Sequence, residues 1–196
     1  MPKQQLIAVL QLDNCPNRDG RATAVPKTVE LEGHSLALAR LTRMGYICSL
    51  TPSNAPFVDI QGFHFETKKP ILVQVKTISE ERSLDWQLSA ERFLNVHKSE
   101  QPDGRIHMQV RGRLPLSNQT IYWVFILLTE NHCDNCRNYL DRYYICTLKD
   151  VQDIAERKFT ADMAKKNGYR KGGSGSTHFR VEESDLKNFT DWTMLT

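Results

Sequence analysis

The sequence lacks any hydrophobic stretch long enough to cross a membrane. Its longest apolar run, Ile121–Leu128, has eight residues, whereas a membrane-spanning helix needs about 20. The first residues, Met1–Gln5, do not show the charged and then apolar layout of a signal peptide. Cysteines number only five, an odd count, and their irregular spacing is not that of a disulfide framework. We therefore expect a cytoplasmic protein that does not act on a membrane.

An excess of charge of one sign is also missing. The chain has 26 Lys and Arg against 23 Asp and Glu, and the net charge of +3 permits nucleic-acid binding without indicating it. There is no internal repeat. A length of 196 residues suits one domain with a full hydrophobic core. We expect a single domain over 1–196, with a core at about 28–165 and a C-terminal extension at 166–196.

The order of the expected elements favours an α/β fold with a mixed central β-sheet flanked by helices. A first helix is expected over 28–44, because Thr28 suits the N-cap, Glu30 the first turn and Gly45 the stop. Strands are expected at 4–11, 46–50, 57–65, 71–77, 121–128 and 142–148. Further helices are expected at 89–98 and 149–167, an irregular stretch at 99–119, and a short strand with a helical turn within 179–195.

One expected strand, Ile71–Thr77, carries polar residues in an otherwise apolar run. Its sequence is ILVQVKT, so Gln74 and Lys76 project from one face while Val73 and Val75 project from the other. A buried ammonium is costly unless it meets an anion. The pattern therefore indicates an anionic partner for Lys76, although a strand pair with one solvated face would have the same pattern.

The preceding segment supplies such a partner. Glu66–Pro70 reads as a hairpin turn, so the chain can fold back and bring Asp59 beside the expected strand. Asp59 can offer a carboxylate, Gln74 a side-chain carbonyl and Val75 a backbone carbonyl, which are the oxygen ligands that Mg²⁺ prefers. Lys76 could then orient or deprotonate an attacking water, or neutralise charge on a phosphate.

Two residues of the first helix could face the same cleft. Glu30 and His34 are four positions apart and share one helix face, so both are candidate catalytic residues. Glu30 could equally be a first-turn carboxylate that interacts with the helix dipole. His34 could equally be a buried core histidine or a phosphate contact.

These motifs resemble those of the PD-(D/E)XK nuclease superfamily, in particular its small bacterial members. The segments that carry the resemblance are the helix with Gly33 and Gly45, GYICSLTPSNAPFVDI, ILVQVKT, RYYICTLKDV and DLKNFTDWTML. The resemblance implies a restriction-endonuclease-like sandwich and hydrolysis of DNA phosphodiester bonds that depends on Mg²⁺, with Mn²⁺ as a substitute. By position, Asp59 matches the metal-binding aspartate and Lys76 the motif lysine, while Gln74 stands where the family usually has a carboxylate.

The sequence departs from the family pattern in three places. Val58 rather than proline precedes Asp59, His34 stands where many relatives have glutamate, and Gln74 removes a full charge from the metal site. We expect an endonuclease that acts on DNA. The alternative is a catalytically weak or inactive nucleic-acid-binding module of the same fold, as a subunit of a defence or mobile-element system. Either protein could form a homo-oligomer.

Two further segments contain candidate ligands. Cys133 and Cys136 form half of a zinc site, which His132 and Cys146 could complete, but we expect free thiols in a polar loop and no zinc. The glycine-rich stretch 165–178 offers backbone N–H groups, hydroxyls and cations to a DNA backbone, although such a composition is also that of a flexible surface loop. Its candidate phosphate contacts are Lys165, Lys166, Arg170 and Lys171.

Overall fold

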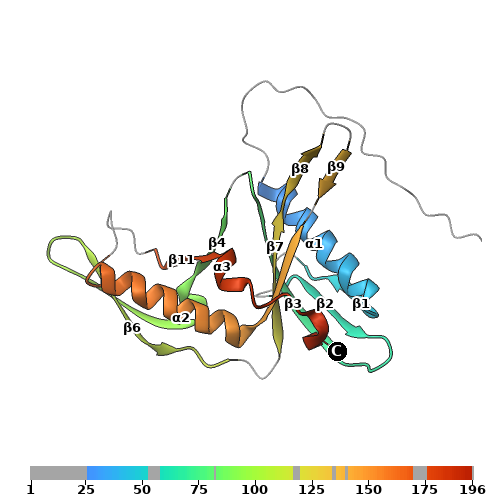
Figure 1. Cartoon of the computed structure of the whole chain (residues 1–196). Coiled ribbons are helices and arrows are strands. Elements are labelled where there is room, and N and C mark those ends of the chain that lie inside the picture. Colours follow the sequence, from blue (N-terminus) through green and yellow to red (C-terminus); the bar gives the residue numbers. More distant parts are fainter. Residues whose placement is uncertain are drawn as a thin grey trace, which may run out of the picture.

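A five-stranded mixed β-sheet lies at the centre of the protein. The computed structural model describes residues 26–52, 58–81, 83–116, 120–133, 136–139, 141–169 and 176–195. The strands, in their order across the sheet, are β1 (Tyr46–Leu50), β2 (Ile60–His64), β3 (Pro70–Ser79), β7 (Ile121–Leu128) and β10 (Arg142–Thr147) (Figure 1). The β3–β7 pair is parallel and the other neighbours are antiparallel. The expected α/β fold with a mixed central sheet is confirmed.

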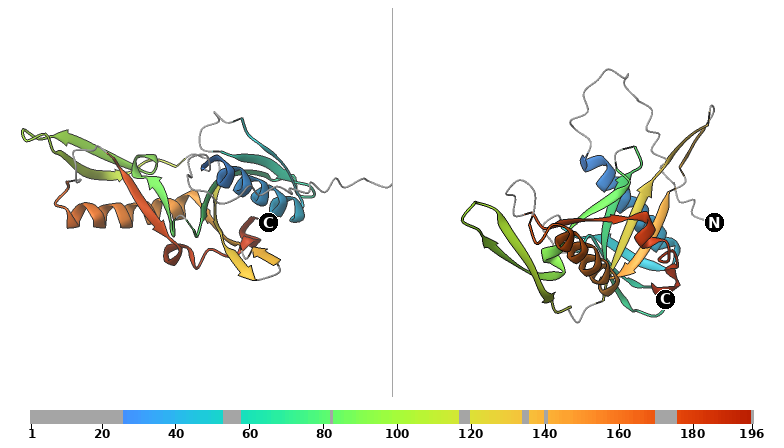
Figure 2. Two further views of the ribbon diagram at one scale, coloured as in Figure 1. Left: turned by 90° about the horizontal axis from the view of Figure 1, so that it is seen from above. Right: turned by 60° about the vertical axis from the view of Figure 1, so that its left-hand side comes forward.

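Two long helices lie on opposite sides of this sheet, α1 (Pro26–Arg43) and α2 (Leu148–Lys165) (Figure 2). The first ends at Arg43 and is followed by Gly45, whose φ of +88° is a conformation that favours glycine. The second begins with a capping box, in which Thr147 and Asp150 satisfy each other's backbone N–H groups. Both helices lie within a few residues of the predicted ranges.

Each face of the sheet has its own hydrophobic core, because side chains alternate between the faces of a strand. On one side Val73 and Val75 pack with Leu41 of α1. On the other side Trp123 and Phe125 pack with α2 and its neighbours. Strand β7 is buried from Trp123 to Leu128, as its apolar sequence predicts.

Shorter elements cover the α2 side of the sheet. They are β4 (Asp85–Ser89), which pairs with β11 (His178–Glu182), the 3₁₀ turn η1 (Ala90–Arg92), and β5 (Leu94–Glu100), which pairs with β6 (Ile106–Arg113). The β5–β6 hairpin projects away from the central sheet beside α2 (Figure 1). The helix expected over 89–98 is therefore wrong, and so is the irregular stretch over 99–119, since both contain strand residues. The alternation of Leu94 and Val96 with exposed neighbours has the period of a strand.

The end of the chain returns to the α1 side. A hairpin of β8 (Glu130–Cys133) and β9 (Cys136–Tyr139) lies between β7 and β10 in the chain. After β11, the short helix α3 (Glu183–Leu186) leads to the turn η3 (Trp192–Leu195). The guanidinium of Arg40 lies 4.7 Å from the ring centre of Trp192, and the Tyr46 hydroxyl donates to the carbonyl of Leu195. The expected strand at 4–11 lies outside the described residues. Within the described part of the chain, no helix is long and apolar enough to cross a membrane.

Candidate active site

Asp59 lies immediately before β2, at the point where the pairing of β2 with β3 ends. Its backbone N–H donates to the carbonyl of Val73 at 2.8 Å. Its side chain then hydrogen-bonds to β3 where a strand backbone would otherwise pair. Oδ2 accepts hydrogen bonds from the N–H of Val75, at 2.7 Å, and from the side-chain amide of Gln74. The carboxylate is thus held by two donors from β3, as the hairpin prediction requires.

Gln74 is buried, with 4% of its surface exposed, and its amide nitrogen lies between two oxygens. Nε2 donates to Oδ2 of Asp59 and lies 3.5 Å from the carbonyl oxygen of Val75. The N–H and C=O of one residue in an extended strand point to the same side, so Val75 presents its carbonyl to the Asp59 side of β3. Two acceptor oxygens therefore converge on one position, which suits a donor or a cation.

Lys76 follows on the same face of β3 as Gln74. Its backbone is fixed by the indole of Trp86, whose Nε1–H donates to the Lys76 carbonyl at 3.0 Å. Burial lowers the pKa of Lys76, and nearby Arg92 lowers it further, while the negative charge of Asp59 opposes both effects. The lysine is therefore a partly covered cation within electrostatic range of the aspartate.

Helix α1 approaches this cluster at a glycine. A Cβ added to Gly33 would lie 1.7 Å from Oγ1 of Thr77, so only glycine allows α1 to pack this closely on β3. The contact brings Nε2 of His34 to 3.5 Å from Oδ2 of Asp59, which is too long for a well-formed hydrogen bond. This buried nitrogen has no hydrogen-bond partner among the described residues. Glu30, one turn earlier, is exposed and acts on Lys76 through its charge.

The ionisation of Asp59 reflects these neighbours. Burial alone would raise the pKa of its carboxyl group, but His34, the N–H of Val75 and the charge of Lys76 together outweigh burial and lower the pKa. Asp59 therefore remains a carboxylate in the folded protein at neutral pH.

The donor set fits a divalent cation only in a limited way. The described residues contain no group of three or more His, Cys, Asp or Glu side chains that could hold a metal ion. Asp59 and Val75 offer two converging oxygens, and Mg²⁺ is commonly bound through one or two carboxylates together with waters and substrate phosphates. Gln74, expected as an oxygen ligand, presents its nitrogen to Asp59. Its amide would have to turn over to offer Oε1 instead.

The candidate phosphate contacts are only partly described. Lys165 and Lys166 border a pocket of about 680 Å³ between α2 and β11. Lys166 forms an ion pair with Asp162 at 2.5 Å, one turn earlier on α2. Arg170 and Lys171 lie outside the described residues.

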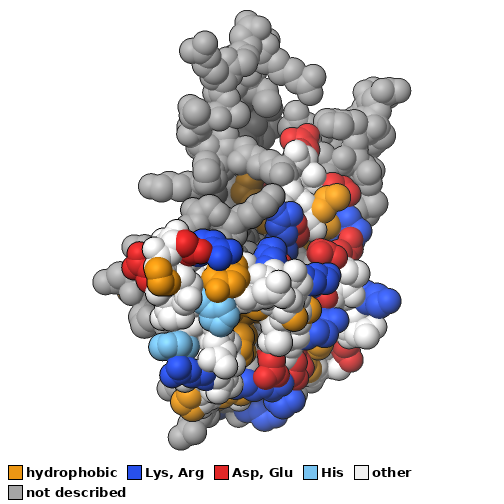
Figure 3. Space-filling model, turned by 90° about the vertical axis from the view of Figure 1, so that its left-hand side faces the viewer, with side chains coloured by type: hydrophobic (Ala, Val, Ile, Leu, Met, Phe, Trp, Pro, Cys, Tyr) orange, Lys and Arg blue, Asp and Glu red, His pale blue; other side chains and the backbone are white. Residues whose placement is uncertain are grey.

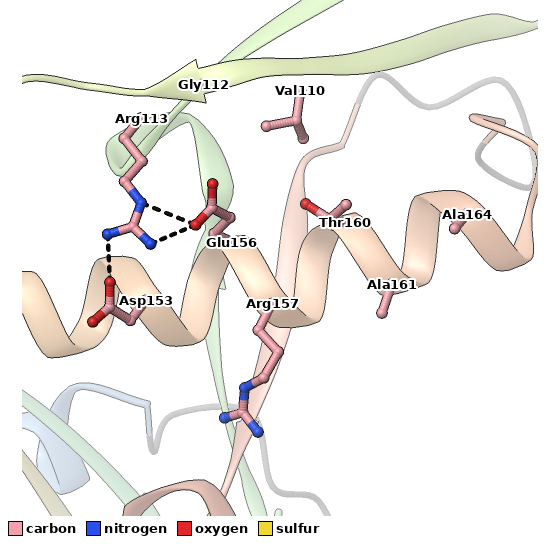
Figure 4. A pocket seen from close by; sticks show the side chains of 9 residues that line it. All are labelled: Val110, Gly112, Arg113, Asp153, Glu156, Arg157, Thr160, Ala161 and Ala164. Carbon is pink, nitrogen blue, oxygen red and sulfur yellow. Dashed lines mark hydrogen bonds and ion pairs between the residues drawn. The ribbon is translucent and has the colours of Figure 1, made fainter.

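A second pocket, of about 810 Å³, lies between β6 and α2 (Figure 4). Arg113 reaches across from β6 and forms ion pairs with Asp153 and Glu156 on α2. Its charge is therefore already neutralised, and the pocket lacks the residues of the Asp59 cluster.

The cysteine pair has a defined backbone but no described side chains. Cys133 and Cys136 face each other across the β8–β9 hairpin. The expectation of no zinc there stays a prediction. Cys48 and Cys146, whose side chains are described, are both free thiols.

Two residues of the cluster were not predicted from the sequence. Arg92 of η1 acts on Lys76 through its charge, and Trp86 of β4 donates a hydrogen bond to the Lys76 carbonyl. The sequence does not indicate either role. Both depend on how η1 and β4 pack over the sheet, and the sequence pattern predicts neither element.

Comparisons with known proteins add little to this picture. No family model matches the chain, and no curated protein sequence matches it. Among solved structures, the chain is similar to a bacterial homing endonuclease, I-Ssp6803I, with 13% sequence identity and a TM-score of 0.39. The similarity covers 81% of this chain and 78% of the other. A likeness of this strength assigns neither family nor activity, so membership of the PD-(D/E)XK superfamily stays a prediction.

Proposed function

We propose that the protein is a metal-dependent nuclease that hydrolyses DNA phosphodiester bonds at the cluster of Asp59, Gln74 and Lys76. The observation that supports this most is the position of Asp59. Its carboxylate, from the residue before β2, accepts hydrogen bonds from two consecutive residues of β3, and the half-buried side chain of Lys76 follows directly. A carboxylate, converging oxygens and a cation in one place are the groups that phosphate chemistry requires.

Asp59 and Val75 would hold the cation, Mg²⁺ or Mn²⁺, with Gln74 contributing Oε1 after its amide turns over. Among the described residues, the donors Gln74 and Val75 both bond to Oδ2 of Asp59, and the cation would bind at Oδ1. When bound, the cation would stabilise negative charge on the phosphate and lower the pKa of a bound water.

Lys76 would act on the water or on the phosphate. A lowered pKa makes the neutral amine more accessible than in an exposed lysine, so Lys76 can accept a proton from the attacking water. In its charged form it would neutralise the phosphate instead. Arg92 would add a second positive charge nearby, and His34 would face Asp59 from α1.

The alternative function is nucleic-acid binding without cleavage. The residue that favours it is Gln74, because an amide satisfies Asp59 by hydrogen bonding and leaves the site with one carboxylate fewer for a metal. The sheet edge is then complete without any cation.

A cleavage assay separates the two functions. Linear, circular and single-stranded DNA are incubated with the full chain in Mg²⁺, in Mn²⁺ and in EDTA, beside Asp59→Ala and Lys76→Ala. Matched controls are Asp191→Ala and Lys149→Ala, which replace exposed residues far from the cluster in sequence. The proposal requires cleavage by the parent and both controls, and a loss of about 100-fold or more in both site variants, the scale of one general acid–base group. Cleavage that persists in both site variants contradicts it, and binding without cleavage in all proteins supports the alternative.

A further inference from the structure

The β5–β6 hairpin is a two-stranded ribbon with two unlike faces. Its register places Lys98 opposite Met108 and Val96 opposite Val110, so these four side chains share a face. Met108 is 2% exposed within the core on the α2 side, and the two valines pack against the same core. The inward face is thus fixed against the protein, and the other face is left outward.

The outward face consists of hydrogen-bonding side chains only. Within the two strands its members are Asn95, His97, Ser99, His107, Gln109 and Arg111. None of them is acidic or aliphatic, although the chain as a whole has 23 Asp and Glu. Four of them are exposed, and their side chains form no hydrogen bond or ion pair with the described residues, namely Asn95, His97, Gln109 and Arg111.

The other cations of the ribbon are already paired. Lys98 contacts Glu91, Arg105 contacts Asp103, and Arg113 contacts two acidic residues of α2. Arg111 differs from them because it stands beside amide and imidazole groups without a carboxylate. A face with unpaired positive charge and no acid complements a polyanion. Figure 3, which views the molecule from the side on which the ribbon projects, shows histidines near Lys and Arg side chains.

The dimensions of the ribbon fit a groove of duplex DNA. Strands of seven and eight residues, at about 3.4 Å per residue, extend for roughly 25 Å. The major groove, about 12 Å wide, admits a two-stranded β-ribbon and displays a distinct donor and acceptor pattern for each base pair. A ribbon of this length spans about seven base pairs, at about 3.4 Å per pair.

The ribbon also starts next to the candidate active site. Phe93, the residue between η1 and β5, packs its ring on Trp123 at 5.3 Å between centroids. Trp123 is in turn the direct neighbour of Gln74 across the β3–β7 pair. A duplex that brings a phosphate to Lys76 therefore passes close to the base of the ribbon.

We propose that the outward face of the β5–β6 ribbon reads base edges in the major groove of duplex DNA and makes cleavage sequence-specific. Gln109 and Arg111 are the principal contacts, since Gln forms bidentate hydrogen bonds with adenine and Arg forms them with guanine. This inference rests on the proposed nuclease function and adds to it the recognition of particular sequences. His97, opposite Gln109, and Asn95 extend the same surface.

A selection from random duplexes tests the inference. The full chain is bound to a library of random DNA duplexes in EDTA, which prevents metal-dependent cleavage but leaves contacts to bases intact, and the retained sequences are determined. The ribbon variant is Gln109→Ala with Arg111→Ala. The matched control is Gln61→Ala with Arg43→Ala, which are also exposed and lie on β2 and α1. All these side chains are exposed, so each variant should keep the parent's thermal unfolding midpoint.

We expect the parent and the control to enrich the same motif. The ribbon variant should lose enrichment at two or more adjacent positions, with affinity for the motif lower by roughly 5- to 150-fold for each two-point contact removed. Its affinity for unrelated duplexes should change by less than about threefold, because most non-specific binding comes from phosphate contacts.

Three results would overturn the inference. They are no enrichment by the parent, an unchanged motif in the ribbon variant, and tighter binding to RNA than to duplex DNA. The outcome is independent of the proposed function, since Asp59→Ala should abolish cleavage and retain the motif. A parent that enriches a motif but never cleaves disproves the nuclease and leaves the ribbon inference standing. A parent that cleaves DNA without sequence preference disproves the ribbon inference and leaves the nuclease function standing.

Discussion

Replacing Gln74 by glutamate should make the stability of the protein depend on pH and on metal ions. The Gln74 amide is buried and donates to Oδ2 of Asp59. Gln74→Glu keeps the shape of the side chain but places a second carboxylate at hydrogen-bonding distance from the first. Two carboxylates in one buried position cannot both remain charged without a large cost.

The cost can be worked out from two limits. Two like charges about 3 Å apart repel by about 5.5 kcal/mol at an effective dielectric constant of about 20. Protonating a glutamate of ordinary pKa, about 4.3, costs about 3.7 kcal/mol at pH 7 and about 1 kcal/mol at pH 5. The protonated form is the cheaper one and can still donate to Asp59. We therefore expect Gln74→Glu to lower the free energy of unfolding by up to about 4 kcal/mol at pH 7 and by about 1 kcal/mol at pH 5.

The sign follows from proton binding. The folded variant holds a proton that the unfolded chain has released between pH 5 and 7, so its stability falls as the pH rises. Mg²⁺ can replace that proton between the two carboxylates, and adding it at pH 7 should stabilise the variant more than the parent. Denaturant unfolding at several pH values, with and without Mg²⁺, measures both effects.

Two controls isolate the carboxylate pair. Gln74→Met removes the hydrogen bond without adding charge, and should cost about 1 kcal/mol at every pH. Combining Gln74→Glu with Asp59→Asn exchanges the two groups, and should remove most of the pH dependence. If Gln74→Glu lowers stability by less than about 0.5 kcal/mol at pH 7, or equally at pH 5 and 7, the two side chains are not neighbours and the site is wrong.

Two further predictions concern the same cluster. Lys76→Met should abolish cleavage yet leave stability at pH 7 unchanged or raised by about 1 kcal/mol, since a half-buried cation is replaced by an apolar chain of similar length. Because the pKa of Lys76 is lowered in the folded state, the stability of the parent rises as the pH approaches the ordinary value of 10.5, and the stability difference between variant and parent should shrink there. Thermal unfolding at several pH values and a DNA cleavage assay measure both effects. A strongly destabilised Lys76→Met protein would refute the prediction. Gly33→Ala should lower the free energy of unfolding by about 1–3 kcal/mol, because the new Cβ overlaps Oγ1 of Thr77. Adding Thr77→Ala should recover part of that loss in denaturant unfolding, and a Gly33→Ala protein as stable as the parent would show that α1 does not pack there.

Much of the central fold could be predicted from sequence because its signals are local. The apolar run of β7 and the alternation in β3 identify strands directly, and Gly45 marks the end of α1. The β5 and β6 strands were missed for the opposite reason. Their inward residues are buried by α2, which lies about 40 residues further along the chain, so only the folded arrangement shows which face is covered.

The same distinction holds for the candidate site. Asp59 and β3 belong to one hairpin, so their proximity follows from a short turn. The approach of Arg92 depends on the packing of Phe93 against Trp123, a contact that no local pattern encodes. The direction of the Gln74 amide is also a property of the assembled site, since both ends of an amide are compatible with the sequence.

The carboxylate of Asp59 hydrogen-bonds to the edge of β3 beyond the last backbone pair with β2. The same side chain is therefore both a candidate ligand for the cation and part of the strand pairing. Any ligand that moves the carboxylate also breaks its hydrogen bond with the N–H of Val75 and weakens the pairing of the two strands. Occupancy of the site and local order of the sheet margin are therefore thermodynamically linked. Selection for either property should disfavour replacement of this aspartate, because a substitution would remove the ligand and weaken the strand pairing at the same time.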